Sequence, residues 1–87
     1  MSYTIQPYSY KKAKELNVHI EPSTRKNKKI KVVDKDKNVY HIGDMRYNDY
    51  PTYLLKNKRE AEERKRLYHL RHREKTKTGF YARKLLW

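Results

Sequence analysis

Hydrophobic and polar residues alternate most regularly in two short stretches near the middle of the chain, on either side of a polar link. Ile30 and Val32 share one face of the first stretch, "KIKVV". Tyr40 and Ile42 share one face of the second, "VYHIG", and this period of two is typical of β-strands. The link, "DKDKN", contains the Asp and Asn residues that favour tight turns. The pattern predicts a β-hairpin whose apolar face needs a cover, because a lone hairpin is barely stable.

The residues before the hairpin predict a helix and a short strand-like segment. Ser9 stands where it could cap a helix over residues 10–17, in which apolar residues recur at every third position. "VHIEP" then alternates for a few residues until Pro22, which ends the segment or places it on a sheet edge. Residues 1–8 have no helical period and are expected to form an extended arm. Residues 9–87 would then make up a single small domain.

Two further helical segments are expected after the hairpin. Asp49 precedes Pro51 within capping range, which predicts a loop followed by a short helix. A longer helix should run from about residue 58 to residue 75, since this stretch lacks Gly, Pro and β-branched residues. Its narrow apolar stripe is expected to pack on the hairpin, and the final block "FYARKLLW" to be buried. The fold predicted is therefore α+β, with a β-hairpin covered by two or three helices.

Three tyrosines at three-residue spacing, Tyr47, Tyr50 and Tyr53, lie between the hairpin and the long helix. A chain of 87 residues buries only about 60–65% of its unfolded surface, so every large side chain counts. Nine tyrosines are available, but few aliphatic residues. We therefore expect the three rings to pack mainly under the hairpin. The alternative is that they stay exposed and stack on nucleic-acid bases.

Basic residues dominate the composition. Lys and Arg number 23 against 10 Asp and Glu, for a formal net charge of +13. Seven of the basic residues fall in residues 25–37 and twelve in residues 56–84. Such a charge is typical of polyanion binders, although a solvated face that only keeps the protein in solution has the same composition. The side chains predicted to contact phosphates are Arg25, Lys26, Lys28, Lys29, Arg64, Lys65, Arg66, Arg71 and Arg73.

The sequence gives little support for a catalytic site or a metal site. The chain has no cysteine, and its two glycines do not form a phosphate-binding loop. His69 and His72 are at helical spacing, but two ligands alone are weak support for zinc. Asp44 near His41 could be drawn as an acid–base pair. So could Glu63 with His69, but such pairs arise by chance in a polar chain. We expect no enzymatic activity, no cofactor and no metal.

No stretch approaches the roughly 18 apolar residues of a membrane span, and the first residues contain no uninterrupted apolar run. The chain is therefore expected to be soluble and not secreted.

Several motifs together resemble a known family. The most specific are Pro22-Ser23-Thr24 followed by lysines, Tyr47-x-x-Tyr50-Pro51-x-Tyr53, Tyr68-x-x-Arg71-His72 and the closing Leu85-Leu86-Trp87. With them the chain, from about residue 12 to residue 87, resembles a family of short basic proteins of unknown function encoded by large nucleocytoplasmic DNA viruses of algae and amoebae. It departs from the family at Lys77-Thr78-Gly79, where relatives often have a further small residue before the final glycine. The resemblance implies a viral origin and incorporation into the virion, and no particular activity.

We therefore expect a non-enzymatic, virion-associated protein that binds nucleic acid, DNA rather than RNA, without sequence preference. It would be found in the virion, and in the host cytoplasm or nucleus during infection. The alternative is a minor capsid or cement protein. Its basic face would lie on acidic capsid subunits, and residues 2–10 and the terminal Leu85-Leu86-Trp87 would insert between them. A ribosomal or transcription-complex subunit would also suit a small basic chain.

Overall fold

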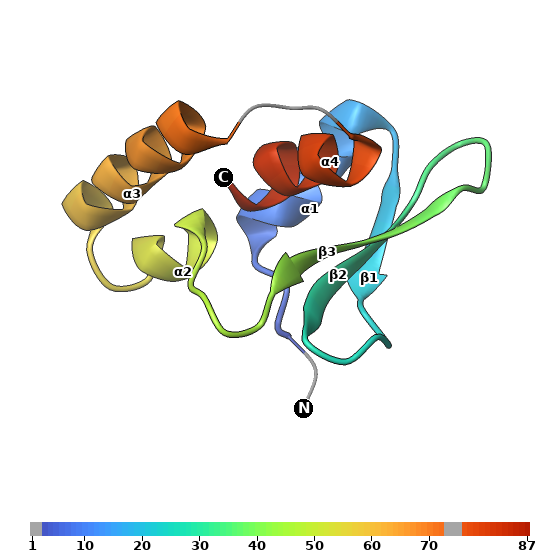
Figure 1. The fold of residues 1–87 in the computed structure, drawn as a ribbon, viewed down its shortest axis with the longest axis horizontal. Coiled ribbons are helices and arrows are strands. Elements are labelled where there is room, and N and C mark those ends of the chain that lie inside the picture. The colour runs from blue at the N-terminus through green and yellow to red at the C-terminus, as the bar shows by residue number, and fades with distance from the viewer. Residues whose placement is uncertain (1–2, 73–75) are drawn as a thin grey trace.

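The protein has an α+β fold, with a three-stranded antiparallel sheet of order β1-β2-β3 packed against helices (Figure 1). The computed structural model describes residues 3–72 and 76–87. The predicted fold class is confirmed, although these residues contain four helices rather than two or three. In chain order the elements are α1 (Pro7–Leu16), β1 (His19–Pro22), β2 (Lys28–Val33), β3 (Val39–Asp44), α2 (Tyr50–Leu54), α3 (Lys58–Arg71) and α4 (Lys77–Leu86).

The predicted hairpin is confirmed as β2 and β3. Ile30 pairs with Ile42 across the two strands, and Val32 pairs with Tyr40. Ile30, Val32 and Ile42 have no exposed surface, so the apolar face read from the alternation is the face that the core covers. In the turn, one carboxylate oxygen of Asp34 accepts two backbone N–H groups, each at 2.9 Å. This is the turn chemistry expected of an Asp at that position.

The strand-like segment before the hairpin becomes the third strand, β1, at the edge of the sheet. Ile20 pairs with Val32 of β2 and is buried. Pro22 is the last residue of β1. Proline lacks a backbone N–H and is tolerated at an edge, as the sequence indicated.

The cover of the sheet comes from α4 and α1, which lie together over one face (Figure 1). Leu85 and Leu86 of α4 are almost fully buried in the core, as predicted for the final apolar block. The Ser9 hydroxyl of α1 donates to the Leu85 carbonyl at 2.7 Å, which ties the two helices together. The helical state of this block was not predicted. Its first turn is capped by Thr76, whose hydroxyl accepts from the Gly79 N–H at 3.0 Å.

The long helix α3 packs mainly on α2, so the expectation that it covers the hairpin was wrong. Its apolar stripe is too narrow for that role: Ala61 is the one fully buried side chain among its residues. The helix ends at Arg71, with the Asn57 side chain accepting from the Glu60 N–H at its start. Residues 73–75, which the prediction included in this helix, lie outside the described part of the chain.

The extended arm expected over residues 1–8 is also corrected. Helix α1 begins at Pro7 rather than after Ser9, because proline is pre-organised for a first helical turn. Residues 3–6 precede it without regular structure but are packed: Ile5 is 8% exposed and belongs to the core. The Tyr3 hydroxyl donates to an Asp49 carboxylate oxygen at 2.7 Å. This segment is therefore part of the domain.

Candidate functional site

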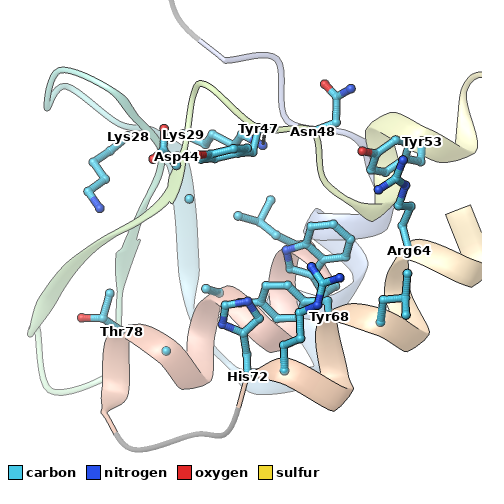
Figure 2. A pocket seen from close by; sticks show the side chains of 17 residues that line it. Lys28, Lys29, Asp44, Tyr47, Asn48, Tyr53, Arg64, Tyr68, His72 and Thr78 are labelled. Carbon is cyan, nitrogen blue, oxygen red and sulfur yellow. Dashed lines mark hydrogen bonds between the residues drawn. The ribbon is translucent and has the colours of Figure 1, made fainter.

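A cleft of about 630 Å³ lies between the end of the hairpin and the helices α3 and α4 (Figure 2). Its volume falls within the roughly 300–1,000 Å³ typical of ligand pockets. The lining residues come from β2, β3, the loop after β3, α2, α3, the residue after α3, α4 and the last residue of the chain. The nonpolar lining residues include Gly43, Leu67, Ala82 and Leu86. The cleft therefore joins segments that are far apart in the sequence.

One wall of the cleft is a stack of three rings. Tyr68 lies between His72, with ring centroids 4.2 Å apart and planes at 21°, and Trp87, at 4.5 Å and 7°. The Tyr53 ring lies 6.4 Å from Trp87 at a tilt of 47°. Burial raises the pKa of the Tyr68 hydroxyl, so it stays protonated at neutral pH. These rings give the cleft an aromatic side.

The rim of the cleft is basic. Lys28 of β2 lies on one side, and Arg64 of α3 on the other (Figure 2). Arg71, in the last turn of α3, also lines the cleft. Within residues 3–72 and 76–87, no carboxylate lies within ion-pairing distance of Lys28 or Arg71. Arg64 is 3.8 Å from Glu60, a long and half-exposed pair. Among the described carboxylates, none therefore holds these three cations in a short ion pair.

Asp44 is the acidic residue on this lining, and its charge is balanced locally. Arg46 binds its carboxylate at 2.8 Å through one guanidinium nitrogen and at 3.1 Å through another. These hydrogen bonds lower the pKa of Asp44 to about 2, so the pair stays ionised at neutral pH. The net charge of the cleft rim therefore remains positive.

The prediction that Lys29 contacts phosphates is wrong, because its side chain is buried and already paired. Its side chain is only 5% exposed, and its Nζ donates to the Asp49 Oδ2 at 2.8 Å and to the Tyr47 carbonyl at 2.5 Å. A buried lysine that already has an anionic partner cannot also neutralise a phosphate in solution. The sequence did suggest Asp49 as a helix cap, and its Oδ1 accepts from the Thr52 N–H at 3.0 Å. No pattern in the sequence predicted that Lys29 would bind the second carboxylate oxygen of Asp49.

Arg25 and Lys26 are exposed in the loop between β1 and β2. Together with Lys28 they line a shallow depression on the surface. Because Lys28 also lines the cleft, this loop and the cleft form one continuous basic surface. These predicted residues are accessible to a polyanion.

The remaining predicted side chains on α3 differ in environment. Lys65 is half-buried, and its Nζ lies 4.7 Å from the Tyr50 ring centroid. Arg66 is exposed but pairs with Glu63 at 2.7 Å. Lys65 therefore serves packing as a cation over a ring, and Arg66 is partly neutralised. Arg73 lies outside the described residues.

The three tyrosines have three different environments. Tyr50 is 7% exposed, and its hydroxyl donates to Glu62 at 2.7 Å. Tyr53 is half-buried beside the cleft. Tyr47 is 66% exposed and also lines the cleft. The expected packing under the hairpin is thus wrong: Tyr47 is exposed, and Tyr50, although buried, packs on Tyr8 of α1 and binds Glu62 of α3.

Neither acid–base pair drawn from the sequence is formed. The His41 Nδ1 lies 2.7 Å from the Ser23 hydroxyl, while Asp44 binds Arg46. Burial, and then the nearby charge of Arg25, lower the pKa of His41, which favours its neutral form.

The second drawn pair is separated in the same way, because Glu63 binds Arg66. The Arg83 Nε donates to the His69 Nδ1 at 2.8 Å, which leaves Nε2 to donate to the Trp87 carbonyl at 3.3 Å. His69 therefore holds the end of α4 against α3. Among the described residues, no group of three or more His, Asp or Glu side chains is placed to hold a metal ion.

Comparisons with known proteins give no match: no family model, no curated protein and no solved structure corresponds to this chain. The resemblance to viral proteins therefore stays a prediction. In the described part of the chain, no helix combines the length and the apolar character needed to cross a membrane.

Proposed function

We propose that this protein binds nucleic acid without sequence preference, through phosphate contacts of its basic surface. The observation that carries the proposal is the meeting of two basic blocks at one cleft. Lys28 comes from the first block, and Arg64 and Arg71 come from the second, more than thirty residues later. A cleft lined by one sign of charge concentrates the opposite charge of a ligand. A phosphate backbone is a ligand that has this charge at regular intervals.

The mechanism is phosphate neutralisation with release of counterions, so affinity should fall steeply as salt rises. The surface includes Arg25 and Lys26 beyond the cleft, which lengthens the track that a backbone could follow. Contacts of this kind position a nucleic acid but do not read its sequence. On the resemblance to viral proteins, the place of action that we propose is the virion.

The packing of the chain ends favours this function over that of a capsid cement protein. That alternative needs the N-terminal segment and the last three residues to insert between capsid subunits. Ile5, Leu85 and Leu86 instead belong to the core of the domain, and the Trp87 ring is stacked on Tyr68. Insertion of these side chains elsewhere would open the core.

The test is binding of the purified protein to a labelled duplex and a labelled single strand, followed by fluorescence anisotropy across about 50 to 300 mM salt. The cleft variants are Lys28→Gln and Arg71→Gln. Each should weaken binding several-fold and reduce the log–log salt slope by about 1, the effect of one lost phosphate contact. The matched control is Lys35→Gln, which removes the same charge from the exposed hairpin turn outside the cleft lining.

Weak binding of the wild-type protein at the lowest salt would refute the proposal and point to an acidic protein partner instead. Equal losses in the cleft variants and in the control would show a diffuse electrostatic attraction. In that case the cleft would not be the binding surface.

A further inference from the structure

The cleft contains aromatic rings as well as cations, and phosphate contacts alone do not require them. Tyr47 lines one side of the hollow, and Tyr68 and His72 line the opposite side (Figure 2). Trp87 and Tyr53 lie beside them. Aromatic rings next to basic side chains are the combination with which proteins hold single-stranded nucleic acids, because every base has a face that can stack.

We propose that the cleft binds one unpaired base of a single-stranded nucleic acid, stacked on Tyr47, with the adjacent phosphates on Lys28 and Arg71. The inference rests on the proposed function and specifies its substrate as single-stranded. Tyr47 is the ring on which it depends, since a side chain that is 66% exposed has ring surface to offer. Burial of so large a ring against a base would remove apolar surface from water on both partners.

The Tyr47 backbone is held in position before any ligand binds, because its carbonyl accepts from the buried Lys29. The Arg46 guanidinium carbon lies 5.7 Å from the Tyr47 ring centroid, and Arg46 hydrogen-bonds to Asp44. The ring thus has a cation beside it and a fixed backbone beneath it, which lowers the backbone entropy lost when a base stacks on it.

A duplex would not satisfy this site. Within a double helix the faces of each base are covered by its neighbours, and a protein reaches only the base edges in the grooves. Rings on the walls of a concave site can contact a base face only after that base has left the stack. A duplex could still contact Lys28, Arg64 and the exposed loop, but its bases would stay outside the cleft.

The variants that test the proposal keep the charge of the surface constant. Tyr47→Ala should weaken binding of a single-stranded oligothymidylate by about tenfold, and should leave binding of a duplex unchanged. Tyr47→Phe keeps the ring and should stay within about twofold of the wild type. The control is Tyr10→Ala: this tyrosine of α1 is 50% exposed but does not line the cleft. It should bind both nucleic acids as the wild type does.

A second readout uses Trp87, the one tryptophan of the sequence, whose ring lines the cleft. Oligothymidylate should change its fluorescence, whereas an abasic strand of equal length should bind about tenfold more weakly and leave the fluorescence unchanged.

If Tyr47→Ala and the abasic strand bind as tightly as their references, the base-stacking inference is wrong and phosphate binding alone remains. If the wild-type protein binds neither the single strand nor the duplex, the proposed function itself fails. The two failures are therefore distinguishable in one set of titrations.

Discussion

Replacing Lys29 by methionine should destabilise the protein by about 3–5 kcal/mol, because it leaves a buried carboxylate without its cation. The side chains of Lys29 and Asp49 are 5% and 1% exposed and are joined at 2.8 Å. Asp49 also accepts from the Tyr3 hydroxyl at 2.7 Å and from the Thr52 N–H at 3.0 Å. The pair therefore connects the N-terminal segment, the sheet and the start of α2.

The magnitude follows from the distance. Two unit charges 2.8 Å apart attract by about 6 kcal/mol at an effective dielectric constant of about 20. Part of this attraction offsets the cost of taking both charges out of water. In the Lys29→Met variant the cost for Asp49 remains and the attraction is gone. A domain of this length has a total stability of only about 4–13 kcal/mol, so the loss is large.

The assay is urea unfolding followed by circular dichroism and Trp87 fluorescence. A matched control is Lys31→Met, two residues along the same strand. Lys31 pairs with Glu21 at 3.3 Å, but both side chains are solvent-accessible, at 29% and 45%. Loss of this exposed ion pair should lower the free energy of unfolding by less than about 1 kcal/mol.

A double variant, Lys29→Met with Asp49→Asn, separates loss of the pair from loss of packing. Asparagine can still cap α2 and has no charge, so the double variant should be more stable than Lys29→Met alone. The reasoning would be refuted if Lys29→Met cost no more than Lys31→Met, or if the effects of the two single changes simply added.

Two further changes have defined outcomes. Gly43→Ala should lower the free energy of unfolding, measured in urea, by about 2–4 kcal/mol. The reasons are that Gly43 has a φ of +81° and that an added Cβ would lie 2.8 Å from the Leu86 Cδ1. Stability equal to the wild type would show that β3 and α4 can separate at no cost. Burial and then the Glu62 hydrogen bond raise the pKa of Tyr50 to about 12, so its contribution to stability is full below pH ~10 and is lost as pH rises through about 12. Tyr50→Phe should flatten that loss in pH-dependent unfolding, and an unchanged profile would count against this assignment.

The sequence was sufficient for the hairpin and for the N-terminal cap of α2, because both depend on local rules. Alternation of period two placed Ile30 and Val32 in the core, and Asp49 before Pro51 marked a helix start. It failed for α4, because the final apolar block predicted burial but gave no sign of a helix that begins before Gly79. The Thr76 cap and contact with the sheet instead keep Gly79 inside a first turn. Tertiary packing here overrides a weak local propensity.

The burial of Lys29 could not be predicted from local sequence rules, for a different reason. By the period of a strand, a lysine next to the core residue Ile30 is expected to meet solvent. The Lys29 side chain is instead covered by Tyr3, whose ring centroid lies 5.3 Å from the Lys29 Nζ, and by the backbone of Tyr47. Both covering residues belong to segments whose path no local pattern predicts.

The location of the cleft could not be predicted from the sequence either, although its basic and aromatic residues could be recognised there. The cleft exists because of where α3 lies, and the one fully buried side chain in α3 is Ala61. Polar and aromatic contacts must therefore hold the helix, including the stack of Tyr68 on Trp87 and the hydrogen bond from Arg83 to His69. Tyr68 and Trp87 also line the cleft. A ligand that contacts these rings would stabilise the same contacts that place α3, so binding and the packing of this helix should be thermodynamically coupled.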